Sequence, residues 1–155
     1  MSADEVAQLR RQIERERAAR KQAEELLEER IREVTHANQL LQRYLDSVPC
    51  MVVALDTQGC IAMINRAGCA LLGQPESALR GQAWFERCLP QPGGSAVLLP
   101  CFQQLVAGNA QAQEELSEYS VLDGDGQARL MAWHTGTLTD AAGQIVGTLS
   151  SGEEI

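Results

Sequence analysis

The spacing of apolar residues changes near residue 45, and this change divides the chain into two parts. From Leu27 onwards the apolar positions alternate steps of four and three residues, which is the a/d spacing of a coiled coil. Residues 3–45 contain no Gly and no Pro, and strong helix formers dominate them. The pattern predicts an N-terminal coiled-coil helix over residues 1–45 and a separate folded domain over residues 46–155.

The predicted seam of this helix also indicates how the helix would pair. Its members are Leu27, Ile31, Val34, Asn38, Leu41 and Leu45. Asn38 takes an a position, where a buried amide fixes the register and favours a parallel two-stranded pairing. We therefore expect a parallel homodimer. The alternative is a single amphipathic helix packed on its own domain, but at ~1.5 Å per residue such a helix would reach far beyond that domain.

From residue 46 the apolar residues follow period two and short runs, which are typical of β-strands. Met51–Leu55 and Cys60–Ile64 predict two strands joined by an Asp/Gly turn, which together form a hairpin. Asn65 is a helix cap, so we expect a helix over Arg66–Leu72 that ends at Gly73.

Further along the chain the pattern predicts short helices and then three more strands. A helical turn ends at Gly81, Trp84-Phe85 is an adjacent aromatic pair, and Pro100 lies in the first turn of a helix that ends at Ala107. The three strands cover about Gln113–Leu122, Ala128–Leu138 and Gln144–Gly152. The domain therefore belongs to the α+β class.

Charge is distributed unevenly and limits the partners of the domain. Residues 1–45 hold nine acidic and nine basic side chains, so the net charge of −8 lies entirely in residues 46–155. An acidic domain repels phosphate groups and anionic lipid headgroups, so we expect neither nucleic acid nor a membrane as a partner. We expect a cytoplasmic protein, because no signal peptide is recognisable and the five cysteines are spaced as free thiols.

No catalytic or metal-binding pattern is recognisable in the sequence. His36 and His134 lie on different predicted elements, and neither belongs to a nucleophile motif. Asp123 and Asp125 begin like a calcium loop, but the remaining ligands are absent. We therefore expect that the chain is not an enzyme and has no metal site.

Seven short motifs in sequence order resemble the PAS family, the sensor modules of bacterial signalling proteins. They are Leu55-Asp-x-x-Gly59, Ile64-Asn-Arg-Ala67, Leu72-Gly73, Gly81-x-x-Trp-Phe85, Trp133, Asp140-x-x-Gly-x-x-x-Gly147 and Ser151-Gly-Glu-Glu-Ile155. The resemblance implies a five-stranded antiparallel sheet with short helices on one face. The N-terminal helix is similar to those that precede PAS domains in two-component sensor histidine kinases and diguanylate cyclases, which implies an effector domain of one of these types.

The resemblance also suggests three candidate cofactor-binding residues, because PAS domains can hold haem, flavin or small metabolites between helices and sheet. Trp84 matches a Trp of flavin-binding redox members, Asn65 would hydrogen-bond FAD or another flavin, and His134 lies on a predicted strand beside Trp133. Each also has a structural interpretation, as a core side chain, a helix cap and a structural histidine. A haem site is disfavoured, because the helix that begins at Pro100 contains no histidine.

These observations predict a sensory and dimerisation module that relays a ligand-induced or redox-induced change. The coiled coil and the last strand, Gln144–Ile155, would carry that change to the effector domain. One alternative is a redox sensor that binds flavin. The other is a ligand-free module for protein–protein interaction, whose interior is filled by its own side chains.

Overall fold

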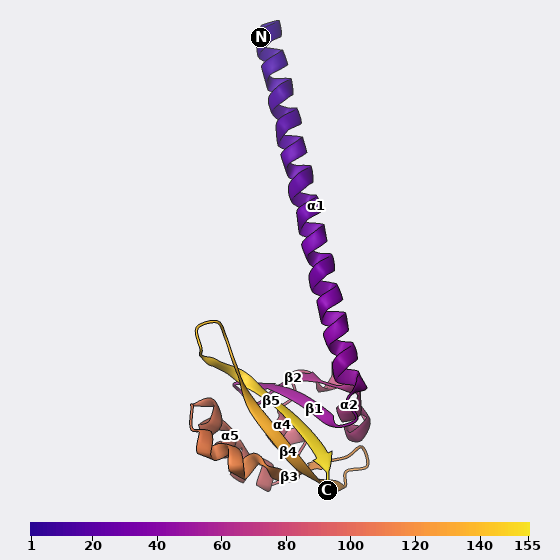
Figure 1. The fold of residues 1–155 in the computed structure, drawn as a ribbon, viewed down its shortest axis with the longest axis vertical. Coiled ribbons are helices and arrows are strands. Elements are labelled where there is room, and N and C mark those ends of the chain that lie inside the picture. The colour runs from indigo at the N-terminus through magenta and orange to yellow at the C-terminus, as the bar shows by residue number, and fades with distance from the viewer. The chain divides into compact units, whose positions relative to one another are not determined.

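The computed structural model describes all residues from Met1 to Ile155, which form the compact units Met1–Arg43 and Tyr44–Ile155. The helix α1 (Ala3–Ser47) makes up most of the first unit, and its final turn, from Tyr44 on, belongs to the second unit (Figure 1). Ser2 and Glu5 begin the helix with a capping box: each side chain accepts a hydrogen bond from the other residue's main-chain N–H, at 3.2 and 3.3 Å. No residue of α1 is buried. The predicted long N-terminal helix is confirmed.

The second unit contains an antiparallel sheet of five strands in the order β2-β1-β5-β4-β3 (Figure 1). The strands are β1 (Met51–Asp56), β2 (Ile61–Ile64), β3 (Glu118–Leu122), β4 (Ala128–Thr139) and β5 (Ile145–Glu154). The last strand lies in the centre, because β5 pairs with β1 on one side and with β4 on the other. The segment after α1 and the C-terminal segment are therefore neighbours in the sheet.

The helical elements pack on one face of this sheet. They are α2 (Arg66–Leu72), α3 (Glu76–Leu79), α4 (Trp84–Arg87), a π-helical turn η1 (Gly94–Leu98), α5 (Leu99–Val106) and a 3₁₀ helix η2 (Ala110–Leu116). The core lies between them and the sheet, where alternate strand residues such as Val53 and Val121 meet Leu79, Phe85 and Phe102. The predicted PAS-like arrangement of sheet and helices is confirmed.

The local signals placed α2 correctly. Asn65 Oδ1 accepts a hydrogen bond from the N–H of Gly68 at 3.0 Å, so Asn65 caps the helix as expected. Gly73 ends it in the left-handed conformation, with a φ of 70°.

The predicted start of the strand that ends at Leu122 was wrong. The strand expected from Gln113 begins only at Glu118, because the preceding residues form η2. Asn109 caps η2, and Ala112 and Leu116, four residues apart, are both buried, which is a helical and not a strand pattern. The helix expected from Pro100 is confirmed as α5, which has Pro100 in its first turn and Ala107 as its C-cap, and it directly follows the π-helical turn that begins at Gly94.

No helix of the structure combines the length and the apolar character that crossing a membrane requires.

Candidate functional site

Three aromatic side chains fill the interior between α4 and the sheet. The fully buried ring of Trp84 packs edge-on against Trp133, with ring centroids 5.9 Å apart. Tyr119 stacks on Trp133 at 4.9 Å, and its hydroxyl accepts a hydrogen bond from Trp84 Nε1 at 3.3 Å. Burial raises the pKa of the Tyr119 hydroxyl, so this group stays protonated at any physiological pH.

Asn65 lies at the start of α2, and its side chain binds four main-chain groups in three segments: the end of α1, the start of β1 and α2 itself. Its Oδ1 accepts hydrogen bonds from the N–H groups of Val52 and Gly68, at 2.9 and 3.0 Å. Its Nδ2 donates to the carbonyls of Leu45 and Cys50, at 3.1 and 2.9 Å. An amide side chain has two acceptor and two donor positions, so the hydrogen-bonding capacity of Asn65 is fully used.

Trp84 and Asn65 do not fit a flavin in this conformation. A flavin beside Trp84 would have to displace the packed rings, and Asn65 has no free donor or acceptor to offer. The structure also separates the third candidate from them, because Trp133 faces the core and His134, the next residue, is exposed on the other face of the sheet. A cofactor role for the three residues stays a prediction.

The outer face of the sheet carries three exposed leucines on β4, the strand of His134, and on the neighbouring β5. Leu130 and Leu138 alternate with the inward-facing residues of β4, and Leu149 lies beside them on β5. All three leucines are exposed large hydrophobic side chains.

The inner face of β4 and β5 carries hydroxyl groups that sequence reasoning missed. Thr135 Oγ1 and Ser150 Oγ form a buried hydrogen bond of 2.9 Å. Thr148 is fully buried, and its Oγ1 has no hydrogen-bond partner. This oxygen is the one buried polar side-chain atom without a hydrogen-bond partner. Leaving such a hydroxyl unpaired lowers the stability of the fold by about 1–3 kcal/mol. The alternation of Thr148 and Ser150 on the predicted last strand was the only signal that pointed to it.

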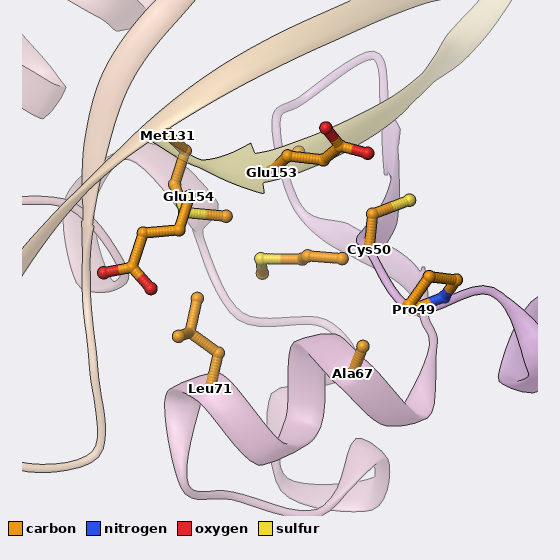
Figure 2. Close-up of a pocket in the computed structure, with 9 residues that line it drawn as sticks. Pro49, Cys50, Ala67, Leu71, Met131, Glu153 and Glu154 are labelled. Atoms are coloured by element: carbon orange, nitrogen blue, oxygen red, sulfur yellow. The ribbon is translucent and has the colours of Figure 1, made fainter.

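A surface pocket of about 350 Å³ opens between α2 and the ends of three strands (Figure 2). Ala67 and Leu71 form its α2 side, and Met131 lies opposite. Glu153 and Glu154 lie at its rim with their carboxylates directed away from its centre (Figure 2). Its surface is therefore mainly apolar, with negative charge outside it.

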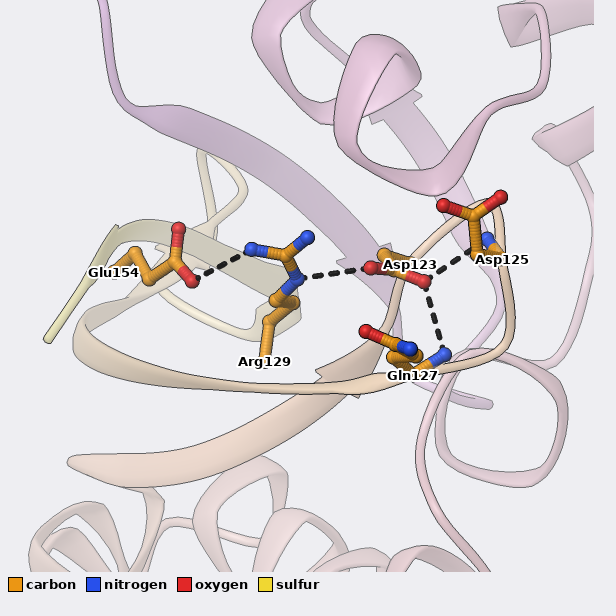
Figure 3. Close-up of polar contacts among 5 residues, drawn as sticks. All are labelled: Asp123, Asp125, Gln127, Arg129 and Glu154. Atoms are coloured by element: carbon orange, nitrogen blue, oxygen red, sulfur yellow. Dashed lines mark hydrogen bonds and ion pairs between the residues drawn. The ribbon is translucent and has the colours of Figure 1, made fainter.

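The turn between β3 and β4 is joined to the C-terminal end of β5 by side chains (Figure 3). Asp123 Oδ1 accepts hydrogen bonds from the N–H groups of Asp125 and Gln127, both at 2.9 Å, and Oδ2 accepts one from Arg129 Nε at 2.8 Å. Arg129 Nη1 then donates to Glu154 at 3.1 Å. The hydrogen bond from Arg129, followed by the one from Gln127, holds the pKa of Asp123 below its ordinary value.

All five cysteines are free. Burial raises the pKa of Cys88 to about 11. Cys101 donates a hydrogen bond to the Glu115 carboxylate at 2.8 Å, and chiefly this contact raises its pKa to about 11. Both thiols are therefore protonated and weakly nucleophilic near neutral pH. No group of three His, Cys, Asp or Glu side chains is placed to hold a metal ion.

The predicted seam of α1 faces solvent in the single chain. Leu27, Ile31, Val34 and Leu41 are 57–62% exposed. Asn38 is also exposed, whereas Leu45 is half-buried in the second unit.

Comparison with known proteins supports the same fold. The PAS domain of an HTR-like protein from Haloarcula marismortui is 20% identical, with a TM-score of 0.61 over 83% of this chain and 99% of that one. A PAS domain from Colwellia psychrerythraea is 21% identical, with a TM-score of 0.57 over 77% and 97% of the two chains. The PAS domain of the Cronobacter turicensis quorum-sensing receptor RpfR, in complex with BDSF, is 19% identical, with a TM-score of 0.54 over 70% and 96%.

No curated protein matches the chain. The family model described as the PAS fold matches residues 45–155, which include the whole sheet and all the helices packed on it. The chain therefore belongs to the PAS family, whose domains are generally sensory and not catalytic.

Proposed function

We propose that this chain is the sensory and dimerising part of a larger signalling protein, whose effector is a histidine kinase or a diguanylate cyclase. Two copies pair in parallel through α1, and a change in packing within the PAS domain passes to the effector through the helix and β5. The observation that carries this proposal is the seam of α1, because its large apolar side chains are exposed along a helix in which no residue is buried.

The energetics favour association through the helix and not through the acidic domain alone. Burying a Leu or Ile side chain contributes about 1.5–3 kcal/mol, and every seam residue would be buried once from each copy. Residues 1–45 carry equal numbers of acidic and basic side chains, so two helices do not repel each other through net charge. Asn38 in both copies would pair across the seam and hold the parallel register.

The oligomeric state tests this proposal. Val34→Asp plus Leu41→Asp places carboxylates in the seam, and His36→Asp plus Gln39→Asp places as many on the same stretch but away from it. We expect twice the chain mass by light scattering after gel filtration for the wild type and for the control. We expect the chain mass for the seam variant. A dimeric seam variant or a monomeric wild type would contradict the proposal.

Thr148 favours a second proposal about the signal itself, a small neutral ligand that enters between α5 and the sheet and hydrogen-bonds this hydroxyl. Its oxygen is buried without a partner, so a ligand that hydrogen-bonds it would remove the cost of leaving it unpaired. A neutral ligand is favoured over an anion, because the only basic side chains of residues 46–155 lie at or near the surface. They are Arg66, Arg80, Arg87 and Arg129.

Calorimetric titration with 1-decanol, a neutral apolar probe with one hydroxyl, tests this second proposal. We expect binding to the wild type, binding about tenfold weaker to Thr148→Val, and unchanged binding to Thr137→Val, whose hydroxyl is exposed on the neighbouring strand. Dodecanoate should bind more weakly than 1-decanol, because its carboxylate meets no cation inside the domain. Equal affinity of the wild type and Thr148→Val would exclude the hydroxyl as the recognition group.

A further inference from the structure

The last turn of α1 is held to the first turn of α2 by two hydrogen bonds. Asn65 Nδ2 donates to the carbonyl of Leu45 at 3.1 Å, and the N–H of Arg66 donates to Asp46 Oδ1 at 3.0 Å. A carboxylate in the last turn of a helix opposes the macrodipole of that helix, and α1 has no basic residue there. Asp46 is therefore poorly placed for α1 by itself but well placed to accept from the start of α2.

The other end of α2 lies against the turn between β3 and β4. The N–H of Gly124 donates to the carbonyl of Leu71 at 3.0 Å. Gly73 and Gly124 approach so closely that a Cβ added to Gly73 would lie 2.9 Å from the Cα of Gly124. The contact is between main chains, which are close-packed and cannot absorb a shift by changing rotamer.

The β3–β4 turn is also connected to the C-terminal end of β5. Asp123 begins the turn and binds Arg129, which binds Glu154 (Figure 3). Both ion pairs are partly exposed and contribute little to stability. They nevertheless hold the turn and the last residues of β5 in one relative position.

We propose that α2 is a coupling element that transmits a displacement between Leu45–Asp46 and the C-terminal end of β5, by way of the β3–β4 turn. Its two states are the final turn of α1 bound to α2 and the same turn released from it. This inference rests on the proposed relay function of the chain, for which it supplies a route. A direct route also exists through the sheet, because Met51 pairs with Gly152. The route through α2 includes Gly124, whereas the direct pairing of β1 with β5 does not.

The β4–β5 turn provides an internal control. Asp140 Oδ1 accepts from the N–H groups of Ala142 and Gln144, both at 2.9 Å, which repeats the hydrogen bonds of Asp123 in the β3–β4 turn. The two turns thus have the same hydrogen bonds from main-chain N–H groups to an aspartate. The N–H that bonds to α2 is that of Gly124, which lies in the β3–β4 turn. An effect that travels through α2 should alter exchange at Gly124 and Gln127 and leave Gln144 unchanged.

Amide hydrogen exchange measured residue by residue by NMR on the full chain tests the coupling. We expect Asp46→Ala to accelerate exchange about threefold at Arg66, Gly124 and Gln127, within the range by which substitutions along coupled networks act. Ser47→Ala is the matched control, because the Ser47 hydroxyl donates only to Tyr44 within α1. It should change none of these rates.

The reverse experiment uses reciprocity, since coupling between two sites must act in both directions. Arg129→Gln should accelerate exchange at Arg66, whereas Arg80→Gln, which removes the Glu76 pair on α3, should not. Asp46→Asn repeats the first test with a smaller change if Asp46→Ala lowers overall stability. Faster exchange at Arg66 with unchanged rates at Gly124 and Gln127 would overturn the coupling. The mass of the seam variant reports on the proposed dimer independently, so failure of one proposal is distinguishable from failure of the other.

Discussion

The main chain of Gly73 at the end of α2 lies against that of Gly124 in the β3–β4 turn, and an added Cβ on Gly73 would lie 2.9 Å from the Cα of Gly124. Gly73 also has a φ of 70°, so two separate reasons favour glycine there. Gly81 has a φ of 85° but nothing within 4 Å of an added Cβ. Gly73 and Gly81 therefore share the left-handed backbone conformation, but of these two only Gly73 has another main chain close to it.

Replacing these glycines should therefore separate the two effects. We expect Gly81→Ala to lower the free energy of unfolding by about 1 kcal/mol, the cost of a left-handed alanine. Gly73→Ala should cost about 2–4 kcal/mol, because overpacking against Gly124 adds to the same backbone cost. Urea unfolding at one fixed protein concentration measures both. Equal losses would mean that the turn moves aside without cost.

Asn65→Ala should be among the more destabilising single substitutions in the domain. It removes four hydrogen bonds and leaves the buried N–H of Val52 without its partner. We expect a loss of about 3 kcal/mol in the free energy of unfolding. Asn109→Ala, which removes the exposed cap of η2, should cost about 1 kcal/mol under the same conditions. A loss no larger than that of Asn109→Ala would show that water replaces the amide at Asn65.

Stability should fall in acid partly through Asp123. Its pKa is lowered in the folded state by Arg129, so its contribution is fully present above the ordinary aspartate pKa of about 3.9. The contribution is lost as the pH falls through the lower folded-state pKa. We expect the melting temperature of the wild type to exceed that of Asp123→Asn at pH 6, and the difference to shrink below pH ~4. A difference that stays constant between pH 6 and pH 3 would contradict this assignment.

The thiol of Cys101 should become more reactive when its acceptor loses its charge. Glu115→Gln removes the carboxylate that chiefly raises the pKa of Cys101 to about 11. We expect alkylation of Cys101 by iodoacetamide at pH 8 to accelerate about tenfold, since only the thiolate reacts. Glu114→Gln changes the adjacent carboxylate, which is not hydrogen-bonded to the thiol, and should leave the rate unchanged. Peptide mass spectrometry follows each cysteine separately.

Local signals were sufficient for α2 but not for the segment before β3. Asn65 and Gly73 act within their own helix, so their types alone indicated where it begins and ends. Residues 113–117 contain a single apolar residue, Leu116, so they carry no clear periodicity, and a strand was predicted there. Burial of Ala112 and Leu116 against the core made that segment helical. Such a choice depends on neighbours that are distant in the sequence.

The candidate site was less predictable than the fold for the same reason. Trp84 was recognised from the sequence, but whether its ring would contact a ligand or the protein depended on Tyr119 and Trp133 from other strands. Nothing in the sequence singled out Asp46, and Asp123 was noted only because its turn begins like a calcium loop. Their partners, Arg66 and Arg129, became evident only from the folded chain.

The long helix, its heptad seam and the α+β class could be predicted from the sequence, because periodicity, caps and turn residues act over a few positions. The PAS family was indicated by the resemblance of seven short motifs. Which polar groups find hydrogen-bond partners depends on the tertiary structure. It left the Thr148 hydroxyl alone in the interior, used the whole capacity of Asn65, and placed α2 between the end of α1 and the β3–β4 turn. Hydrogen bonds and close main-chain contacts between distant segments depend on how the whole chain packs, and no local pattern encodes them.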